Sequence, residues 1–272
     1  DEPYFTQPQM YDRIRERPSL HRMVADRLLE EDGIDEDKIQ QSEEKINGEL
    51  EAAYEEVHGT ACPFPELRFF ENWDGYHGSY SHEMPQTGVE KERLVEWARR
   101  LATVPSDFKI FSKLEKLLQK RLESVNNGEG IDWANAEALA WASLLAEGHP
   151  VRLSGQDCGR GTFSQRHSVL IDTESGRDYV PLNNLEESQA LYKVYNSLLS
   201  EYGVPGFEYG YATAQPQGLV LWEAQFGDFA NNAQSVIIIR MASGEAKWQR
   251  LSGLGMLLPH GWEGLGPEHS SA

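Results

Sequence analysis

The sequence predicts an α/β fold, in which a mostly parallel sheet follows a mainly helical region. In the second half of the chain, short apolar runs alternate with helical segments at the spacing of βαβ units, whose crossovers are expected to be right-handed. The first half shows helical periodicity without such runs. A break at Asn126-Asn127-Gly128-Glu129-Gly130 separates the halves. We therefore expect a helical and loop segment at residues 1–130 and an α/β domain at residues 131–272.

The first half contains an acidic segment. Residues 26–60 hold 13 acidic and 3 basic residues, and apolar side chains recur there at helical spacing on both sides of Gly33. This pattern favours two acidic amphipathic helices that form a solvated hairpin. Residues 59–89 are rich in Pro, Gly, Trp, His and Tyr without periodicity, which indicates an extended loop with turns. Helical periodicity resumes at residues 91–102 and 112–125.

A run of strong helix formers opens the second half. It predicts a helix from Trp133 to Glu147, with Gly148 as its C-terminal cap. The elements expected after it are strands at residues 151–154, 192–199, 218–222 and 254–258 and helices at residues 203–214 and 229–243. This order is typical of a parallel sheet with crossover helices.

Composition argues against two classes of partner. The chain carries 25 basic and 44 acidic residues, a net charge of −19, whereas nucleic-acid binding draws on clustered cationic side chains. No run approaches the roughly 20 apolar residues of a membrane span, and mean hydropathy is −0.57. Because Cys62 and Cys158 lie far apart, we expect neither a disulfide framework nor a zinc ribbon, and a reducing compartment is the simplest interpretation. The ends, Asp1 and Ala272, are those expected of a piece of a longer protein.

Polar residues follow each of the four expected strands. In open parallel sheets, ligands bind beyond the carboxyl ends of the strands, so these residues are candidates for a site. They are Gln156, Asp157, Glu201, Glu223, Gln225 and His260. The convergence of four strand ends predicts one polar rim, which is a stronger signal than any single residue.

Two interpretations of Glu201 follow from its position. It lies between a strand and an apolar helix, where its carboxyl would be largely desolvated; burial raises the pKa of a carboxyl, so it could hold a proton for a partner nitrogen. Alternatively, it is an acid at a helix N-terminus, favoured by the macrodipole, with Ser200 as the cap. Position alone leaves both open.

Two further stretches combine glycine with charged or histidine side chains. Residues 260–269 place His260 and His269 nine residues apart around three glycines, a spacing unlike that of zinc ligands. Residues 160–167 form a basic patch in an acidic chain, which either meets an anionic ligand or pairs with local carboxylates. We favour pairing with carboxylates.

Several motifs together resemble the decarboxylating component of the 2-oxoglutarate dehydrogenase complex. They are Val151-Arg-Leu-Ser-Gly-Gln-Asp157, Arg160-Gly-Thr-Phe-Ser-Gln-Arg-His167, Leu199-Ser-Glu-Tyr-Gly203, Phe207-Glu-Tyr-Gly-Tyr-Ala212, Trp222-Glu-Ala-Gln-Phe-Gly-Asp-Phe229 and Leu257-Leu-Pro-His-Gly261. The resemblance covers essentially the whole chain and is weakest over residues 26–110. It departs at residues 237–241, where an Arg stands on an expected packing helix and a usual acid is missing.

The resemblance implies a thiamine diphosphate enzyme that decarboxylates 2-oxoglutarate and passes the succinyl group to the lipoyl arm of a dihydrolipoyl succinyltransferase component. Residues 131–272 would form most of its pyrimidine-binding domain, truncated at the C-terminal end. Glu201 would hydrogen-bond the aminopyrimidine ring nitrogen, while His269 and His260 would face the substrate and stabilise its developing charge. The residues that contact the aminopyrimidine would be Gln156, Leu199, Glu201, Gln225 and Phe229.

The same resemblance implies a homodimer in the bacterial cytoplasm or the mitochondrial matrix. The ligands of the diphosphate and of Mg²⁺ are expected outside this chain, so no metal ligand is expected within it. Two alternatives remain. One is a relative that acts on 2-oxoadipate, and the other is a non-catalytic assembly or interaction module that docks through the acidic helices of residues 26–60 and the βαβ unit.

Overall fold

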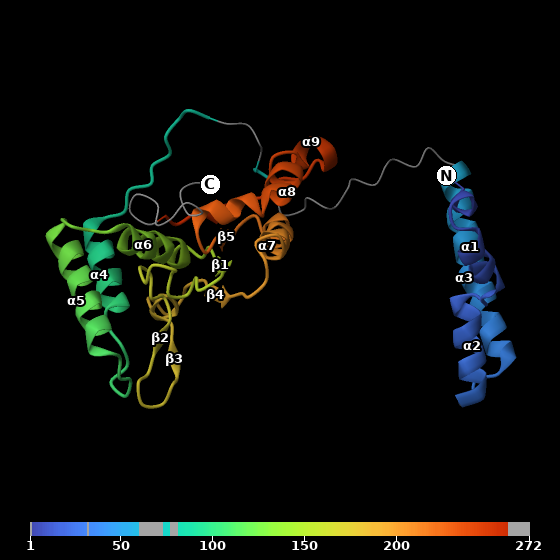
Figure 1. Cartoon of the computed structure of the whole chain (residues 1–272), viewed down its shortest axis with the longest axis horizontal. Helices are drawn as coiled ribbons and strands as arrows, with labels where there is room; N and C mark the ends of the chain where they lie inside the picture. Colours follow the sequence, from blue (N-terminus) through green and yellow to red (C-terminus); the bar gives the residue numbers. More distant parts are fainter. Residues whose placement is uncertain (1, 32, 60–72, 77–80, 261–272) are drawn as a thin grey trace. The chain divides into compact units, whose positions relative to one another are not determined.

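The computed structural model describes residues 2–31, 33–59, 73–76 and 81–260. The chain divides into two compact units, Asp1–Arg68 and Phe69–Ala272, and each is described by itself (Figure 1). The second unit contains the sheet. The domain boundary that we expected at residue 130 stays a prediction.

The first unit is helical. After a short 3₁₀ segment, Pro3–Phe5, it contains α1 (Pro8–Glu16), α2 (Leu20–Glu31) and α3 (Glu36–Gly59). The predicted break at Gly33 is confirmed: this residue has φ +61° and lies between α2 and α3. Arg22 of α2 pairs with Asp26 at 2.7 Å and with Glu36 at the start of α3 at 2.9 Å. Among the described residues of this unit only Ala25 is buried, in keeping with a solvated pair of helices.

Three helices precede the sheet in the second unit: α4 (Lys91–Leu101), α5 (Ser112–Asn127) and α6 (Trp133–Ala146). Glycines in the left-handed region follow two of them, Gly128 at φ +75° and Gly148 at φ +90°, as the sequence predicted for Gly148. The carboxylate of Asp132 caps α6 by accepting the backbone N–H of Asn135 at 2.7 Å. The side chains that α4 and α5 contribute to the core beside α6 include Trp97, Ala98 and Val125.

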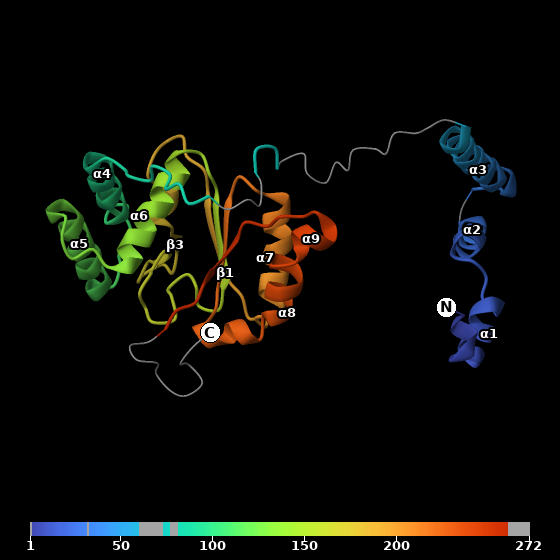
Figure 2. The same cartoon turned by 90° about the horizontal axis from the view of Figure 1, so that it is seen from above.

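A four-stranded sheet forms the centre of this unit. Its strands, in the order in which they pair, are β4 (Tyr192–Asn196), β1 (Val151–Gly155), β5 (Leu219–Glu223) and β6 (Leu254–Leu257), and all three pairings are parallel. Helix α6 lies on one face, and α7 (Gly203–Ala214) lies on the other (Figure 2). The predicted parallel sheet with crossover helices is confirmed.

Alternation along the strands divides the core between the two faces. Leu153 and Leu221 join the cluster that contains α6, whereas Val220 and Trp222 join the cluster that contains Val204 of α7. This is the period-two pattern of a sheet covered on both sides.

Two parts of the second unit differ from expectation. An antiparallel pair, β2 (Leu170–Ile171) and β3 (Asp178–Tyr179), was not predicted, because two-residue strands leave no readable alternation. The helical region expected at 229–243 is broken into a 3₁₀ segment, Gly227–Asn231, then α8 (Gln234–Val236) and a π-helical segment, Ile237–Met241. A further helix, α9 (Gly244–Trp248), was not predicted either.

The unusual Arg240 of the π-helical segment does not enter the core. Its side chain is exposed, and its guanidinium carbon lies 4.7 Å from the ring centroid of Trp248 in α9. The departure from the family pattern is therefore accommodated at the surface. None of the helices in the described part of the chain is both long and apolar enough to cross a bilayer.

Candidate functional site

The carboxyl ends of the four strands lie in one row. In the sheet register Gly155 is opposite both Asn196 and Glu223, and Glu223 is opposite Leu257. Backbone hydrogen bonds continue this alignment into the following segments: Ser197 N–H donates to the Gly155 carbonyl at 2.9 Å, and Ala224 N–H donates to the Leu257 carbonyl at 3.0 Å. The predicted convergence of four strand ends on one rim is confirmed.

Several expected site residues meet at this rim. The Gln225 side-chain amide donates to the Asp157 carboxylate at 3.1 Å, which joins the segments after β5 and β1. The ring centroids of Phe229 and Phe226 lie 6.2 Å apart, and those of Phe226 and Phe163 lie 5.6 Å apart. Together these contacts build a partly buried edge of amide, carboxylate and aromatic groups.

The ring of His260 packs against the backbone of Gly227, which stands between Gln225 and Phe229 in the sequence. A Cβ atom added to Gly227 would overlap the imidazole, so the close approach requires glycine here. The ring is held by a 3.0 Å hydrogen bond between Nδ1 and the Leu258 carbonyl. His260 therefore belongs to the rim, whereas His269 lies outside the described residues.

Glu201 lies in the turn that precedes α7. The residue is nearly buried, at 9 % exposure. Its carboxylate forms no hydrogen bond or ion pair with any of the described residues. The alternative interpretation, with Ser200 as the cap, is wrong: the N-cap of α7 is Tyr202, which makes no side-chain capping bond, and the first turn holds no acid, although the Ser200 hydroxyl accepts the Gly203 N–H at 3.4 Å.

The surroundings of Glu201 are apolar and open. Leu199 is 64 % exposed and Leu198 is 98 % exposed, although both are large hydrophobic side chains. Gln156, directly after β1, is partly buried. A nearly buried glutamate whose carboxylate bonds none of the described residues, beside exposed apolar side chains, is an arrangement suited to a planar heterocycle with a basic ring nitrogen.

The expectation for Glu223 is wrong in one respect, because its side chain does not reach the rim. We took β5 to end at Trp222, but it continues through Glu223, which therefore points to the same face as Leu221, toward α6. There the carboxylate, in a residue 2 % exposed, accepts two hydrogen bonds from Arg166, one of them at 2.8 Å. Burial raises the pKa of Glu223, and the Arg166 guanidinium opposes that shift.

Arg166 also pairs with a second carboxylate. It donates to Glu137 of α6 at 2.7 and 3.1 Å and to the Cys158 carbonyl at 2.7 Å. The basic patch at 160–167 thus pairs with local carboxylates, as favoured from the sequence. Nothing in the sequence links positions 137, 166 and 223, so reasoning from residue types missed this network.

The comparisons with known proteins agree with this geometry. Residues 129–272 match the family model described as transketolase, pyrimidine binding domain. The chain belongs to this family. Over 280 aligned residues it is 47 % identical to the 2-oxoglutarate dehydrogenase E1 components of Brucella ovis and Brucella canis and 46 % identical to that of Brucella anthropi. Each alignment covers the whole chain but only 27 % of the relative, which confirms the resemblance as that of a segment of such a component.

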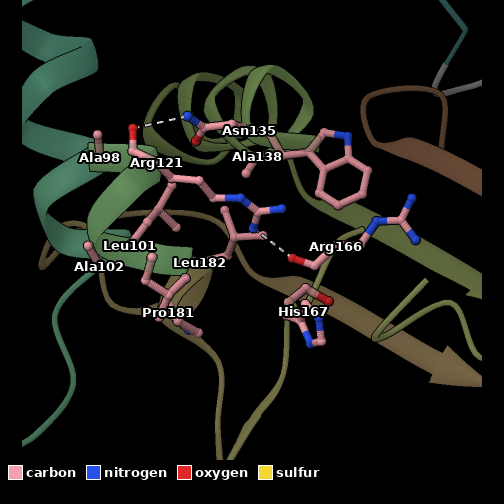
Figure 3. Close-up of a pocket in the computed structure, with 13 residues that line it drawn as sticks. Ala98, Leu101, Ala102, Arg121, Asn135, Ala138, Arg166, His167, Pro181 and Leu182 are labelled. Atoms are coloured by element: carbon pink, nitrogen blue, oxygen red, sulfur yellow. Dashed lines mark hydrogen bonds between the residues drawn. The ribbon is translucent and has the colours of Figure 1, made fainter. Parts of the chain in front are cut away.

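The second unit also contains a small cavity beside its helices. About 40 Å³ in volume, it is lined by apolar side chains of α4 and α6 together with Arg121, Asn135 and His167 (Figure 3). Arg121 donates to the carbonyls of Arg166, at 3.0 Å, and of Gln165, and burial lowers its pKa. A space of this size accommodates a few water molecules at most. We assign it no ligand.

Cys158 of the pyrimidine-binding domain is expected to be inert toward thiol reagents in the folded protein. It is fully buried, its thiol donates to the Tyr195 carbonyl at 3.2 Å, and burial raises its pKa to about 12. The thiolate is the reactive form of cysteine. In a Cys62→Ser variant, which leaves Cys158 as the single thiol of the chain, reaction with a disulfide reagent at pH 8 should be about 100-fold or more slower in the folded protein than in urea. Equal rates in the two states would contradict the buried placement of Cys158.

Proposed function

We propose that this chain is the pyrimidine-binding part of a 2-oxoglutarate dehydrogenase. The whole enzyme would decarboxylate 2-oxoglutarate with thiamine diphosphate and pass the succinyl group to the lipoyl group of a dihydrolipoyl succinyltransferase component. The family match over residues 129–272 and the 47 % identity to bacterial 2-oxoglutarate dehydrogenase E1 components support this proposal. The single structural observation that supports it most is Glu201, a nearly buried carboxyl group without an internal partner among the described residues.

The residue types at the rim suit an aminopyrimidine ring. Glu201, a residue 9 % exposed, would hydrogen-bond the ring nitrogen. Leu199 and Phe229 would provide apolar and aromatic contacts, and Gln156 and Gln225 would provide polar contacts at the ring edge. The bound cofactor would supply an electron sink for the carbanion left by decarboxylation, while the protein orients it and sets proton positions.

The histidines would act on the substrate side. His260 is held at the rim with Nδ1 on the Leu258 carbonyl, which leaves Nε2 for a substrate oxygen. His269 would take the main part in stabilising the charge that develops on that oxygen. These roles rest on the resemblance and on the position of His260 beside Gly227.

The cofactor's diphosphate and Mg²⁺ would be held by residues outside this chain. Among the described residues, no group of three His, Cys, Asp or Glu side chains is placed to hold a metal ion. We further propose a homodimer, and a cytoplasmic location is supported by the bacterial relatives. Both belong to the proposed enzyme as a whole, of which the chain would be about a quarter.

The test is decarboxylation by the longer polypeptide that contains this chain. With thiamine diphosphate and Mg²⁺ present, release of CO₂ is measured for 2-oxoglutarate and for 2-oxoadipate at equal concentrations. We expect 2-oxoglutarate to be the better substrate. Faster turnover of 2-oxoadipate would favour the alternative substrate, and turnover of neither, with salt-sensitive binding of a basic protein partner, would favour the assembly module.

A further inference from the structure

Arg166 connects three separate segments of the pyrimidine-binding domain. The residue is 5 % exposed, and its guanidinium donates to Glu137 on α6, to Glu223 at the end of β5 and to the carbonyl of Cys158 in the segment after β1. The guanidinium carbon also lies 5.3 Å from the ring centroid of Trp141 on α6. We call this set, Arg166 with Glu137, Glu223 and the Cys158 carbonyl, the Arg166 clamp.

Two of the clamped segments lead directly to residues proposed to contact the cofactor. Cys158 follows Gln156 by two positions, and Glu223 precedes Gln225 by two. The hydrogen bond between Gln225 and Asp157 joins the same two segments on the solvent side of the clamp. In addition to the backbone pairing of the two strands, the β1 and β5 sides of the rim are thus joined by one buried and one more exposed side-chain contact.

The chemistry of the clamp requires arginine. Its planar fork donates along two edges at once, to Glu137 through Nε and Nη2 and to Glu223 through Nη1 and Nη2. A lysine ammonium keeps the charge but offers a single point from which three donors diverge, so it cannot hold both carboxylates and the carbonyl in this plane.

A second buried arginine shows that ion pairing alone does not place a residue at the rim. Arg152 of β1 pairs in the same bidentate manner with Glu208 of α7, at 2.7 and 2.9 Å, and both side chains are largely buried. Arg152 lies against the rings of Tyr195 and Tyr211 and bonds neither the segment after β1 nor the end of β5. It is therefore a matched control for burial and ion pairing.

We propose that Arg166 is a positioning residue for the cofactor: by holding the segment after β1 to the end of β5, it presents Gln156 and Gln225 to the aminopyrimidine. The inference rests on the proposed function. It assigns Arg166 a role in cofactor affinity and leaves the proton chemistry to Glu201.

The test compares Arg166→Lys with Arg152→Lys in the longer polypeptide. Because the substitution would shift the residues presented to the ring edge, we expect Arg166→Lys to raise the apparent KM for thiamine diphosphate about tenfold or more, with kcat at saturating cofactor lowered less than about threefold. Both substitutions should lower the melting temperature, because each weakens a buried ion pair. Arg152→Lys should nevertheless leave the KM for thiamine diphosphate within about twofold of wild type. Glu223→Gln, which keeps the shape of the side chain and part of its bonding, should give an intermediate KM and provides a readout if Arg166→Lys does not fold.

The possible outcomes separate this inference from the proposed function. If wild-type enzyme neither binds thiamine diphosphate nor decarboxylates, the proposed function fails. If wild type is active and Arg166→Lys and Glu223→Gln change the cofactor KM no more than Arg152→Lys does, the clamp is only structural and the inference is overturned. A loss confined to kcat, with unchanged KM, would overturn it as well.

Discussion

Replacing Glu201 with Gln in the longer enzyme is expected to lower decarboxylation of 2-oxoglutarate by about 10²- to 10⁴-fold. The amide retains the size of the side chain and a hydrogen bond, but it can neither carry the charge of a carboxylate nor share a proton with a ring nitrogen. Because the Glu201 carboxylate bonds none of the described residues, its loss removes no internal ion pair. The effect should therefore appear in kcat at saturating cofactor and only weakly in stability.

The control for this substitution is Glu147→Gln. Glu147 is an exposed glutamate after α6, so the same chemical change there should leave turnover within about twofold of wild type. Calorimetric titration with thiamine diphosphate and Mg²⁺ shows whether Glu201→Gln still binds the cofactor. A Glu201→Gln enzyme that turns over 2-oxoglutarate at the wild-type rate would refute the role of Glu201.

The parallel sheet was predictable because β strands carry their own signal, although the order of its strands was not predicted. Apolar runs such as Leu219–Trp222 and the alternation of strands with helices are local properties, and the parallel direction follows from crossover connections. Once the strands are parallel, their carboxyl ends share an edge. Gln156, Gln225 and His260 could thus be assigned to one rim before any coordinates were considered.

What could not be predicted depends on single positions or on distant pairings. Extending β5 by one residue reverses the direction of Glu223 and changes it from a rim residue into a buried ion-pair partner. Arg166 meets Glu137 and Glu223 across 29 and 57 positions, and no local pattern encodes such a contact. The lack of a bonding partner for the Glu201 carboxylate among the described residues could not be predicted either, because it depends on which side chains the fold brings near it.

Gly155 is expected to be the least replaceable backbone position of the rim. It ends β1 at φ +152°, and a Cβ atom there would overlap the backbone carbonyl of Glu223 on β5. Since neither strand can retreat without breaking its pairing, Gly155→Ala should lower the free energy of unfolding by about 3 kcal/mol or more. Urea denaturation of the chain, followed by tryptophan fluorescence, measures this loss.

Gly159→Ala is the matched control, because an added Cβ there lies 3.4 Å from the nearest atom, Oδ1 of Asn196, at a normal contact distance. It should cost less than about 1 kcal/mol. Equal stability of Gly155→Ala and wild type would show that β1 and β5 are not held as closely as described. Separation of these strands would also move the Glu223 carboxylate away from Arg166, so a Gly155→Ala enzyme that still folds should lose cofactor affinity in the same manner as Arg166→Lys. That shared consequence makes Gly155→Ala a test of the rim through the backbone, by a substitution that alters no ionisable side chain.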